Sequence, residues 1–410
     1  MRIGFLTSRV PYPLTSGYSV RAYNIIRHLR RSHEVSVYTL GDPLIGGELA
    51  RQLDVRVRVY HNSVAAATLS VLRGAVGRVP LQVRLYRNKA LLSDLSTEIE
   101  SNNLDILFVH LLRMGEYAKA LADIPAIIDA TDSLCLSYQR TPVSWKRPFS
   151  WAVRFERDRV CQYEACLHRW FRTIFVTSPI DACAMRTRTQ SDSITLLPNG
   201  VDLEMFRPTN ILDKHRIIFS GRLDYLPNTD AAIYYAKTIF PKVRERMPHV
   251  RFVIAGSRPP SSVRRLSSID GIEVLADVPD LGAEVAKSVV SVAPLRFGAG
   301  VQNKVLESLA VGTPVICPAS VANPITRGIT LPFISLAGND DEYIAAALSM
   351  LNAPEASKDL GRQAREWVAA NCTWDQALKP LDDVLSSGYS RSGKIVDYIE
   401  SVKVANQELS

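Results

Sequence analysis

Short apolar runs alternate with helix-period segments along almost the whole chain, and this alternation restricts the fold more than any other feature. The first series starts with IGFLTS at residues 3–8 and ends with SITLLPNGV at 193–201. A second series starts with HRIIFSG at 215–221 and continues to TPVICP at 313–318. Strands that alternate with helices predict a mainly parallel sheet with helices on both faces. The predicted fold class is therefore α/β, with two Rossmann-like halves.

The two series meet near PNGVDLEMFRPTN, and 410 residues exceed the size at which one hydrophobic core usually keeps growing. We expect an N-terminal domain at residues 1–203 and a C-terminal domain at 204–388. The polar residues 389–410 form either a tail or a helix that returns to the N-terminal domain. Because ligands bind at the carboxyl ends of parallel strands, we expect the ligand in a cleft between the two domains.

The charge of the chain is uneven. Residues 1–200 carry a net charge of +9, whereas the remainder carries −1. A basic first half suits an anionic partner such as a membrane surface, a lipid phosphate or a nucleic acid, although a solvated arginine-rich surface explains it equally well. No recognised nucleic-acid module is present, so we expect no nucleic-acid partner. The start of the chain has no long apolar segment of the kind that directs export, and we expect a cytoplasmic protein.

The six cysteines follow no regular framework and include no CxxC pair. Together with the expected cytoplasmic location, this predicts reduced thiols. Cys161, Cys166 and His168 come nearest to a metal-binding pattern, but their spacing fits no standard zinc site. We therefore expect no metal site.

The segment APLRFGAGVQNKVLESLAVGTPVI, residues 293–316, is the strongest chemical signal. A strand ends at Pro294, a glycine-containing loop follows, and a helix begins near Gln302. Amide groups at such a helix start form an anion site that suits a pyrophosphate. Lys304 falls in the first helical turn, where a cation is unusual unless it serves an anion, and Glu307 lies on the same face. Taken alone, the segment is better explained as an ordinary turn with an exposed lysine and glutamate.

With two further segments, this stretch resembles the retaining GT-B glycosyltransferases of family 4, and most of all the sugar transferases of bacterial exopolysaccharide gene clusters. The resemblance runs from Ser16 to Trp374 and implies two Rossmann-like domains that face an interdomain cleft. It implies donor contacts from the backbone of the loop and from Glu307, which would bind ribose, and we expect Lys304 to contact the donor as well. The loop residues concerned are Gly300, Val301, Gln302 and Asn303. The family's first glutamate falls on Ala299, so that acidic contact is missing.

The other two matching segments are IIFSGRLDYLPNTDAAIYYA and LLPNGVDLEMFRP. The first implies that Gly221 and Arg222 face the donor diphosphate, with Arg222 neutralising its charge. Family members usually carry a lysine five residues later, where this chain has Pro227, and we expect Lys304 to supply the missing charge. The second segment is interpreted as a turn and hinge.

In the first half, the resemblance assigns Gly17 to a loop that approaches the donor, and the absence of a Cβ suits this close approach. His110, at the end of a strand, takes the place of a histidine that faces the donor sugar. Asp129 and Asp132 follow another strand and are candidates for orienting the acceptor, although capping of the next helix explains them at least as well. Residues 144–172 mix aromatic and basic side chains, which suits either a membrane face or a helix packed on the sheet.

The predicted function is the transfer of a sugar, with retention, from a nucleotide-diphosphate sugar to an acceptor hydroxyl. We expect catalytic roles for His110, Arg222 and Lys304, no cofactor beyond the nucleotide sugar, UDP as the usual nucleotide and GDP as an alternative. The acceptor is a small molecule, a glycan or a lipid-linked compound, which would bring the enzyme to the inner face of the membrane. The alternatives are a nucleotide-sugar epimerase on the same fold and a non-catalytic nucleotide-sugar-binding protein.

Overall fold

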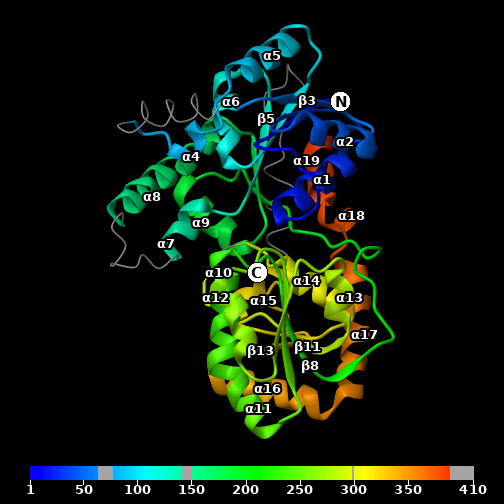
Figure 1. Ribbon diagram of the computed structural model, residues 1–410. Helices are drawn as coiled ribbons and strands as arrows, with labels where there is room; N and C mark the ends of the chain where they lie inside the picture. The colour runs from blue at the N-terminus through cyan, green and yellow to red at the C-terminus, as the bar shows by residue number, and fades with distance from the viewer. Residues whose placement is uncertain (63–76, 141–149, 298–299, 388–410) are drawn as a thin grey trace.

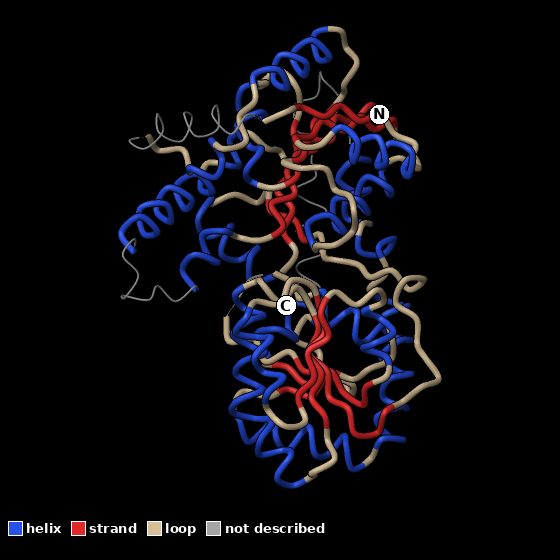
Figure 2. The backbone as a smooth tube through the Cα atoms, viewed as in Figure 1, coloured by secondary structure: helices blue, strands red, loops and turns tan. Residues whose placement is uncertain are grey.

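The computed structural model describes residues 1–62, 77–140, 150–297 and 300–387. Figures 1 and 2 show two lobes, one above the other, each with a twisted sheet between layers of helices. The predicted loop position Ala299 and the predicted tail at 389–410 lie outside the described residues. None of the described helices combines the length and the apolarity needed to span a bilayer.

The N-terminal sheet has seven strands in the order β3-β2-β1-β4-β5-β6-β7, and every adjacent pair is parallel. Strands β4 and β6 are buried along their whole length, and β1 and β5 in all but one residue, as expected of a sheet with helices on both faces. The strands are β1 (Arg2–Thr7), β2 (Glu34–Leu40), β3 (Arg56–Tyr60), β4 (Ile106–His110), β5 (Ala126–Thr131), β6 (Thr173–Val176) and β7 (Ile194–Leu196).

Described helices cover both faces of this sheet, and the first of them is well capped because Ser16 and Ser19 form a reciprocal capping box at its start. They are α1 (Gly17–Leu29), α2 (Pro43–Leu53), α4 (Leu81–Arg84), α5 (Lys89–Glu100), α6 (Gly115–Ala120), α7 (Leu134–Arg140), α8 (Ser150–Ala165) and α9 (Pro179–Thr189), with short 3₁₀ turns η1 (Leu112–Met114) and η2 (Leu167–Arg169).

The C-terminal sheet has six parallel strands in the order β10-β9-β8-β11-β12-β13. They are β8 (Asp213–Ser220), β9 (Arg251–Gly256), β10 (Ile272–Ala276), β11 (Ser288–Val292), β12 (Val315–Cys317) and β13 (Ile334–Leu336). The helices around it are α10 (Leu226–Tyr234), a π-helical turn η3 (Tyr235–Ile239), α11 (Phe240–Arg246), α12 (Ser261–Arg264), a 3₁₀ turn η4 (Arg265–Ser268), α13 (Leu281–Ala286), α14 (Asn303–Ala310), α15 (Ala319–Thr326), α16 (Asp340–Asn352) and α17 (Pro354–Asn371). Both predicted Rossmann-like domains are thus confirmed.

The last two described helices, α18 (Trp374–Ala377) and α19 (Lys379–Ser386), belong to the N-terminal lobe, where Figure 1 shows them beside α1 and α2. Trp374, Leu378 and Leu381 join a buried cluster with Ile3 and Phe5 of β1. The predicted domain boundary at residue 388 is therefore wrong, because the chain returns at 374–386 to cover one face of the first sheet.

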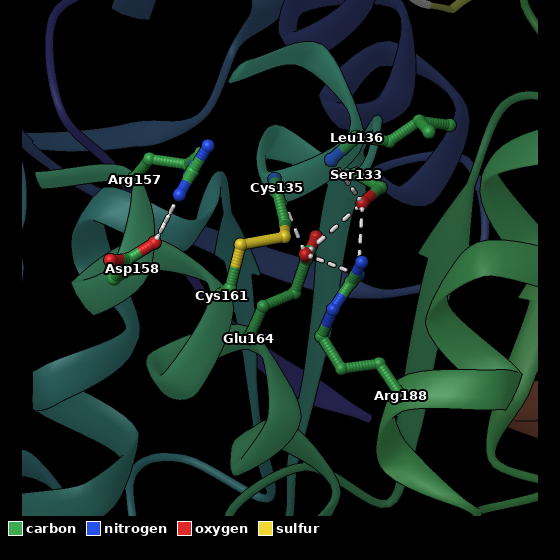
Figure 3. Close-up of a disulfide and its surroundings, with 8 residues drawn as sticks. All are labelled: Ser133, Cys135, Leu136, Arg157, Asp158, Cys161, Glu164 and Arg188. Atoms are coloured by element: carbon green, nitrogen blue, oxygen red, sulfur yellow. Dashed lines mark hydrogen bonds and ion pairs between the residues drawn. A yellow bond between two sulfur atoms is a disulfide. The ribbon is translucent and has the colours of Figure 1, made fainter. Parts of the chain in front are cut away.

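Cys135 and Cys161 form a disulfide between α7 and α8, with their Cα atoms 4.8 Å apart (Figure 3). The prediction of reduced thiols is wrong for this pair, since packing of the two helices brings together cysteines that are 26 residues apart. Beside the disulfide, the Glu164 carboxylate accepts hydrogen bonds from the Ser133 hydroxyl and the Arg188 guanidinium. Cys166, Cys183, Cys317 and Cys372 are free thiols.

Candidate functional site between the two sheets

Each sheet reverses its strand order at one point, and most of the predicted site residues lie at these two points. The first reversal is between β1 and β4, which are followed by the loop before Gly17 and by His110. The second is between β8 and β11, which lead to Gly221 and to the loop before α14. Ligands of open α/β sheets bind where the strand order reverses, beyond the carboxyl ends of the strands.

Lys304 lies in the first turn of α14, and only 7% of it is exposed. Its ammonium group donates to Asn228 Oδ1 at 2.6 Å and lies 4.1 Å from the ring centroid of Phe219. Lys304 forms no ion pair with any residue that the structure describes. Burial lowers the pKa of Lys304 to about 7, although the charge of Glu307 opposes the shift. A buried lysine that forms no ion pair suits an anionic ligand.

The Lys304 ammonium also lies beside the loop that follows β8, because a Cβ added to Gly221 would come within 3.3 Å of it. Asn228 donates to the carbonyl of Arg222 at 2.8 Å and so joins this loop to the lysine. The side chain of Arg222 is 42% exposed and forms a bidentate ion pair with Asp224, with N–O distances of 2.5 and 2.9 Å. The structure therefore brings Gly221, Arg222 and Lys304 together, with Lys304 in the interior and Arg222 at the surface.

Glu307 is half-buried on the same helix, one turn after Lys304. Burial raises the pKa of Glu307 to about 7, against the charge of Lys304. No side chain caps the start of α14, so its first amide groups point to the space before the helix. Val301, Gln302 and Asn303 are half-buried there.

The loop before α14 meets the N-terminal domain at Gly300. Its φ of +72° lies in the left-handed region that favours glycine, and a Cβ at this position would lie 2.9 Å from Asp132 Oδ1 and 3.5 Å from Thr177 Oγ1. Gly17 makes a second close approach, since its Cβ would lie 3.7 Å from Asn303 Nδ2. The predicted glycine loop and the start of α14 therefore face each other across the domain boundary.

His110 is fully buried at the end of β4, in register with Thr7 of β1 and Asp129 of β5. Its Nδ1 lies 2.9 Å from Asp129 Oδ2, and the Tyr18 ring packs 5.0 Å from its own. Burial alone would raise the pKa of Asp129, but the charge of Arg21 and the hydrogen bonds from His110 and Arg21 hold it below its usual value. An ionised Asp129 makes Nδ1 the donor, which leaves Nε2 of a neutral ring as an acceptor. Within the described residues, Nε2 has no hydrogen-bond partner.

The two predicted acceptor residues have different environments. Asp129 is fully buried, and its two oxygens accept hydrogen bonds from Arg21 and His110. Asp132 is half-buried and faces Gly300. Burial and the neighbouring charge of Asp181 raise the pKa of Asp132 to about 7, so it can exchange a proton near neutral pH.

Strained backbone accompanies both strand ends. Leu111, directly after His110, has a φ of +74°, and Thr131, directly before Asp132, has a φ of +67°. Positive φ is rare for a bulky or β-branched residue and costs of order 1–3 kcal/mol. Such strain persists where the surrounding structure fixes it, commonly at ligand sites. In the part of the chain that the structure describes, no group of three or more histidine, cysteine, aspartate or glutamate residues is arranged around a metal position.

Two family models match the chain. The model described as Glycosyltransferase Family 4 matches residues 15–205, and the model described as Glycosyl transferases group 1 matches residues 214–353. Together they match about four fifths of the chain, and the boundary between them is the junction of the two sheets. The chain belongs to the GT-B glycosyltransferases.

Several solved structures share this fold over nearly the whole chain. HepE of Anabaena, in complex with UDP and glucose, has 12% sequence identity and a TM-score of 0.66, with 95% of this glycosyltransferase and 100% of HepE covered. Sucrose-phosphate synthase of Thermosynechococcus elongatus has 14% identity and a TM-score of 0.67, with 94% and 98% covered. TarM of S. aureus, whose complex includes UDP, has 9% identity and a TM-score of 0.65, with 93% and 99% covered. No curated protein sequence matches this glycosyltransferase significantly.

The sequence did not identify three polar residues of the site. Asn228 and Arg21 carry no motif of their own, and their partners are 76 and 108 residues away in the sequence. Asn199 belongs to the segment interpreted as a hinge, and it contacts Asn303 of α14. The Pro-Asn-Gly pattern was the available signal for Asn199, whereas only the fold reveals the other two.

Proposed function

We propose that this glycosyltransferase transfers a sugar from a UDP-sugar to an acceptor hydroxyl, with GDP-sugars as the alternative donors. The observation that carries the proposal is the buried ammonium of Lys304, which forms no ion pair with a described residue and lies between the start of α14 and the Gly221–Arg222 loop. A nucleoside diphosphate supplies the anion that this lysine lacks, and Glu307 accepts hydrogen bonds from the ribose hydroxyls. The UDP complexes of HepE and TarM, which share the fold, support the choice of nucleotide.

In the proposed reaction, the bond between the anomeric carbon and the diphosphate oxygen breaks, and the acceptor oxygen bonds to the same carbon. Negative charge grows on the leaving diphosphate, where Lys304, Arg222 and the first amides of α14 stabilise it. The acceptor proton passes to the leaving phosphate, so no separate base is required. His110 Nε2 accepts a hydrogen bond from a sugar hydroxyl, and Asp132 orients the acceptor beside Gly300. Retention of configuration and a role in bacterial exopolysaccharide or glycoconjugate assembly rest on the resemblance of the motifs.

The cationic side chains take the place that a divalent metal holds in some other transferases, and we propose a metal-independent reaction. A lipid-linked acceptor at the inner face of the membrane fits the basic N-terminal domain. In α8 of that domain, Val153 and Phe155 are 42% and 49% exposed. Part of the aromatic-basic segment at 144–172 lies outside the described residues.

The first test is a donor screen. Purified protein is incubated with UDP-, GDP- and TDP-sugars, with and without lipid-diphosphate acceptors and with and without EDTA, and release of nucleoside diphosphate is followed by mass spectrometry. We expect turnover of one UDP-sugar, unchanged by EDTA. For Glu307→Ala we expect a loss of about 10- to 100-fold in UDP affinity, because a hydrogen bond to a charged group contributes about 1.5–3 kcal/mol. Epimer formation in place of transfer supports the epimerase alternative, and absence of both turnover and nucleotide binding refutes the site assignment.

UDP binding at about pH 8 is expected to take up about 0.5–1 proton per site. The pKa of Lys304 is lowered to about 7 by burial, so the unliganded lysine is mostly neutral at this pH, and the bound diphosphate favours its charged form. The terminal phosphate of UDP, with a pKa near 6, is already ionised. Calorimetry in buffers of different ionisation enthalpy measures the uptake, and UDP affinity should fall as the pH rises above about 7. Uridine, which lacks the phosphates, is the control; equal uptake with both ligands contradicts the role of Lys304.

A further inference from the structure

One fully buried guanidinium organises much of the polar contact at the domain boundary. Arg21 of α1 is 2% exposed and makes a bidentate ion pair with Asp129, with N–O distances of 2.7 and 2.8 Å. It also donates to the carbonyls of Leu197 and Pro198 at 2.9 and 3.2 Å, and to Asn199 Oδ1 at 2.7 Å. These three residues end the first domain.

Asn199 continues this contact into the second domain. Its Nδ2 donates to Oδ1 of Asn303 at 2.7 Å, and Asn303 is the first residue of α14. The amide of Asn199 is therefore held on both sides, by Arg21 as donor and by Asn303 as acceptor. The next residue of α14 is Lys304, so the link ends one residue from the buried ammonium group.

The other end of the network is His110. Asp129 Oδ2 accepts from Arg21 Nε and from His110 Nδ1, at 2.7 and 2.9 Å. A continuous set of side-chain contacts thus runs from His110 through Asp129, Arg21 and Asn199 to Asn303. It joins the histidine of one domain to the anion-binding helix of the other.

We propose that Arg21 is a positioning residue that, through Asn199, fixes the distance between His110 and the start of α14, and so sets the domain arrangement in which sugar transfer occurs. The inference rests on the proposed function. Burying a charged pair costs several kcal/mol that well-packed apolar side chains would avoid, so this network is poorly explained by stability alone. A polar link with fixed donors and acceptors does specify one geometry, which catalysis between two domains requires.

Two variants of Asn199 distinguish the effect of its hydrogen bonds to Arg21 and Asn303, here called the link, from the effect of its packing volume. Asn199→Leu keeps the volume but removes both hydrogen bonds. Asn199→Asp still accepts from Arg21 and can accept from Asn303 once that amide turns. We expect Asn199→Leu to lower kcat for sugar transfer by about 10–100-fold, because small misplacements of reacting groups have effects of this size. Asn199→Asp should stay within about fivefold of the wild type.

Two further readouts distinguish positioning from folding and from a failure of the proposed function. UDP affinity, measured by calorimetry, should change less than about threefold in both variants, because the diphosphate contacts lie in the C-terminal domain. Without any ligand, deuterium uptake in peptides that contain Gly17 and Asn303 should rise in Asn199→Leu but not in Asn199→Asp. If uptake and kcat are the same in wild type and Asn199→Leu, the link is refuted. If wild type binds no UDP while uptake still differs between the variants, the proposed function fails and the link stands.

Discussion

Replacing Lys304 by methionine is expected to lower donor turnover by about 100- to 1000-fold, the size of loss seen when one preorganised donor to a developing anion is removed. The ammonium is buried at the start of α14, beside the Gly221 loop where we propose that the diphosphate binds. Arg222, the other cation of the site, is at the surface and paired with Asp224. Steady-state release of nucleoside diphosphate, with UDP affinity measured separately, checks the result.

The same variant is expected to fold at least as stably as the wild type at pH 7. Burial lowers the pKa of Lys304 from its unfolded value to about 7, so protonation favours the unfolded chain between those two values. The wild type therefore gains stability from this group as the pH rises above about 7, and Lys304→Met removes that gain. Methionine can also fill the space beside Phe219.

Lys214→Met is the matched control, because Lys214 is 57% exposed and paired with Glu355 on the same domain. It should leave turnover within about twofold, since surface ion pairs contribute little. Thermal unfolding between about pH 7 and 9 follows the stability of all three proteins. A Lys304→Met protein that keeps wild-type turnover would remove Lys304 from the site.

Replacing Arg21 by methionine should lower the stability of the N-terminal domain by about 3–5 kcal/mol, because it leaves the carboxylate of Asp129 buried without its main counter-charge. It also leaves the carbonyls of Leu197 and Pro198 without these donors. The expected decrease in Tm is about 10 °C for a domain of this size. Differential scanning calorimetry can resolve this transition if the two domains unfold separately.

The double variant Arg21→Met/Asp129→Asn tests whether the loss of stability in Arg21→Met comes from the unpaired carboxylate of Asp129. Neutralising Asp129 removes the unpaired charge, so part of the lost stability should return. The asparagine amide can still accept from His110 Nδ1. If the double variant is no more stable than Arg21→Met, the loss comes from packing and not from the buried carboxylate.

The alternation of strands and helices was enough to predict two parallel sheets, because the period of the apolar residues depends on local structure. The prediction that Lys304 serves an anion also rested on a local pattern, since a cation is unusual in a first helical turn. Pro227, which stands where family members usually carry a lysine, shows the limit of predicting a site from local patterns. The structure places the Lys304 ammonium beside the Gly221–Arg222 loop, but the idea that it replaces a lysine at position 227 stays a prediction.

Contacts between segments that are far apart in the chain could not be predicted from the sequence. The disulfide joins Cys135 to Cys161 because two helices pack together, and no spacing rule encodes that pairing. Asp129 and Asp132, three residues apart, were given one role, yet Arg21 from another helix pairs with the first and leaves the second facing Gly300. Residues 374–386 were predicted to belong to the C-terminal domain, because the sequence does not show that the apolar face of α19 packs against β1 and α1.

The return of the chain to the N-terminal lobe has a mechanical consequence. Within the described residues, the chain passes between the lobes once after β7 and once between α17 and α18. These two passages lie side by side where Val201 pairs with Thr373 in a parallel bridge. At Gly200 they touch so closely that a Cβ would lie 2.5 Å from the backbone of Trp374. Two connecting segments that pair with each other resist twisting and separation of the lobes. Bending of one lobe against the other, about the line of these segments, is left as the easiest relative motion. Opening of this glycosyltransferase should therefore be a hinge motion about this line, which would widen the proposed ligand site between the two lobes.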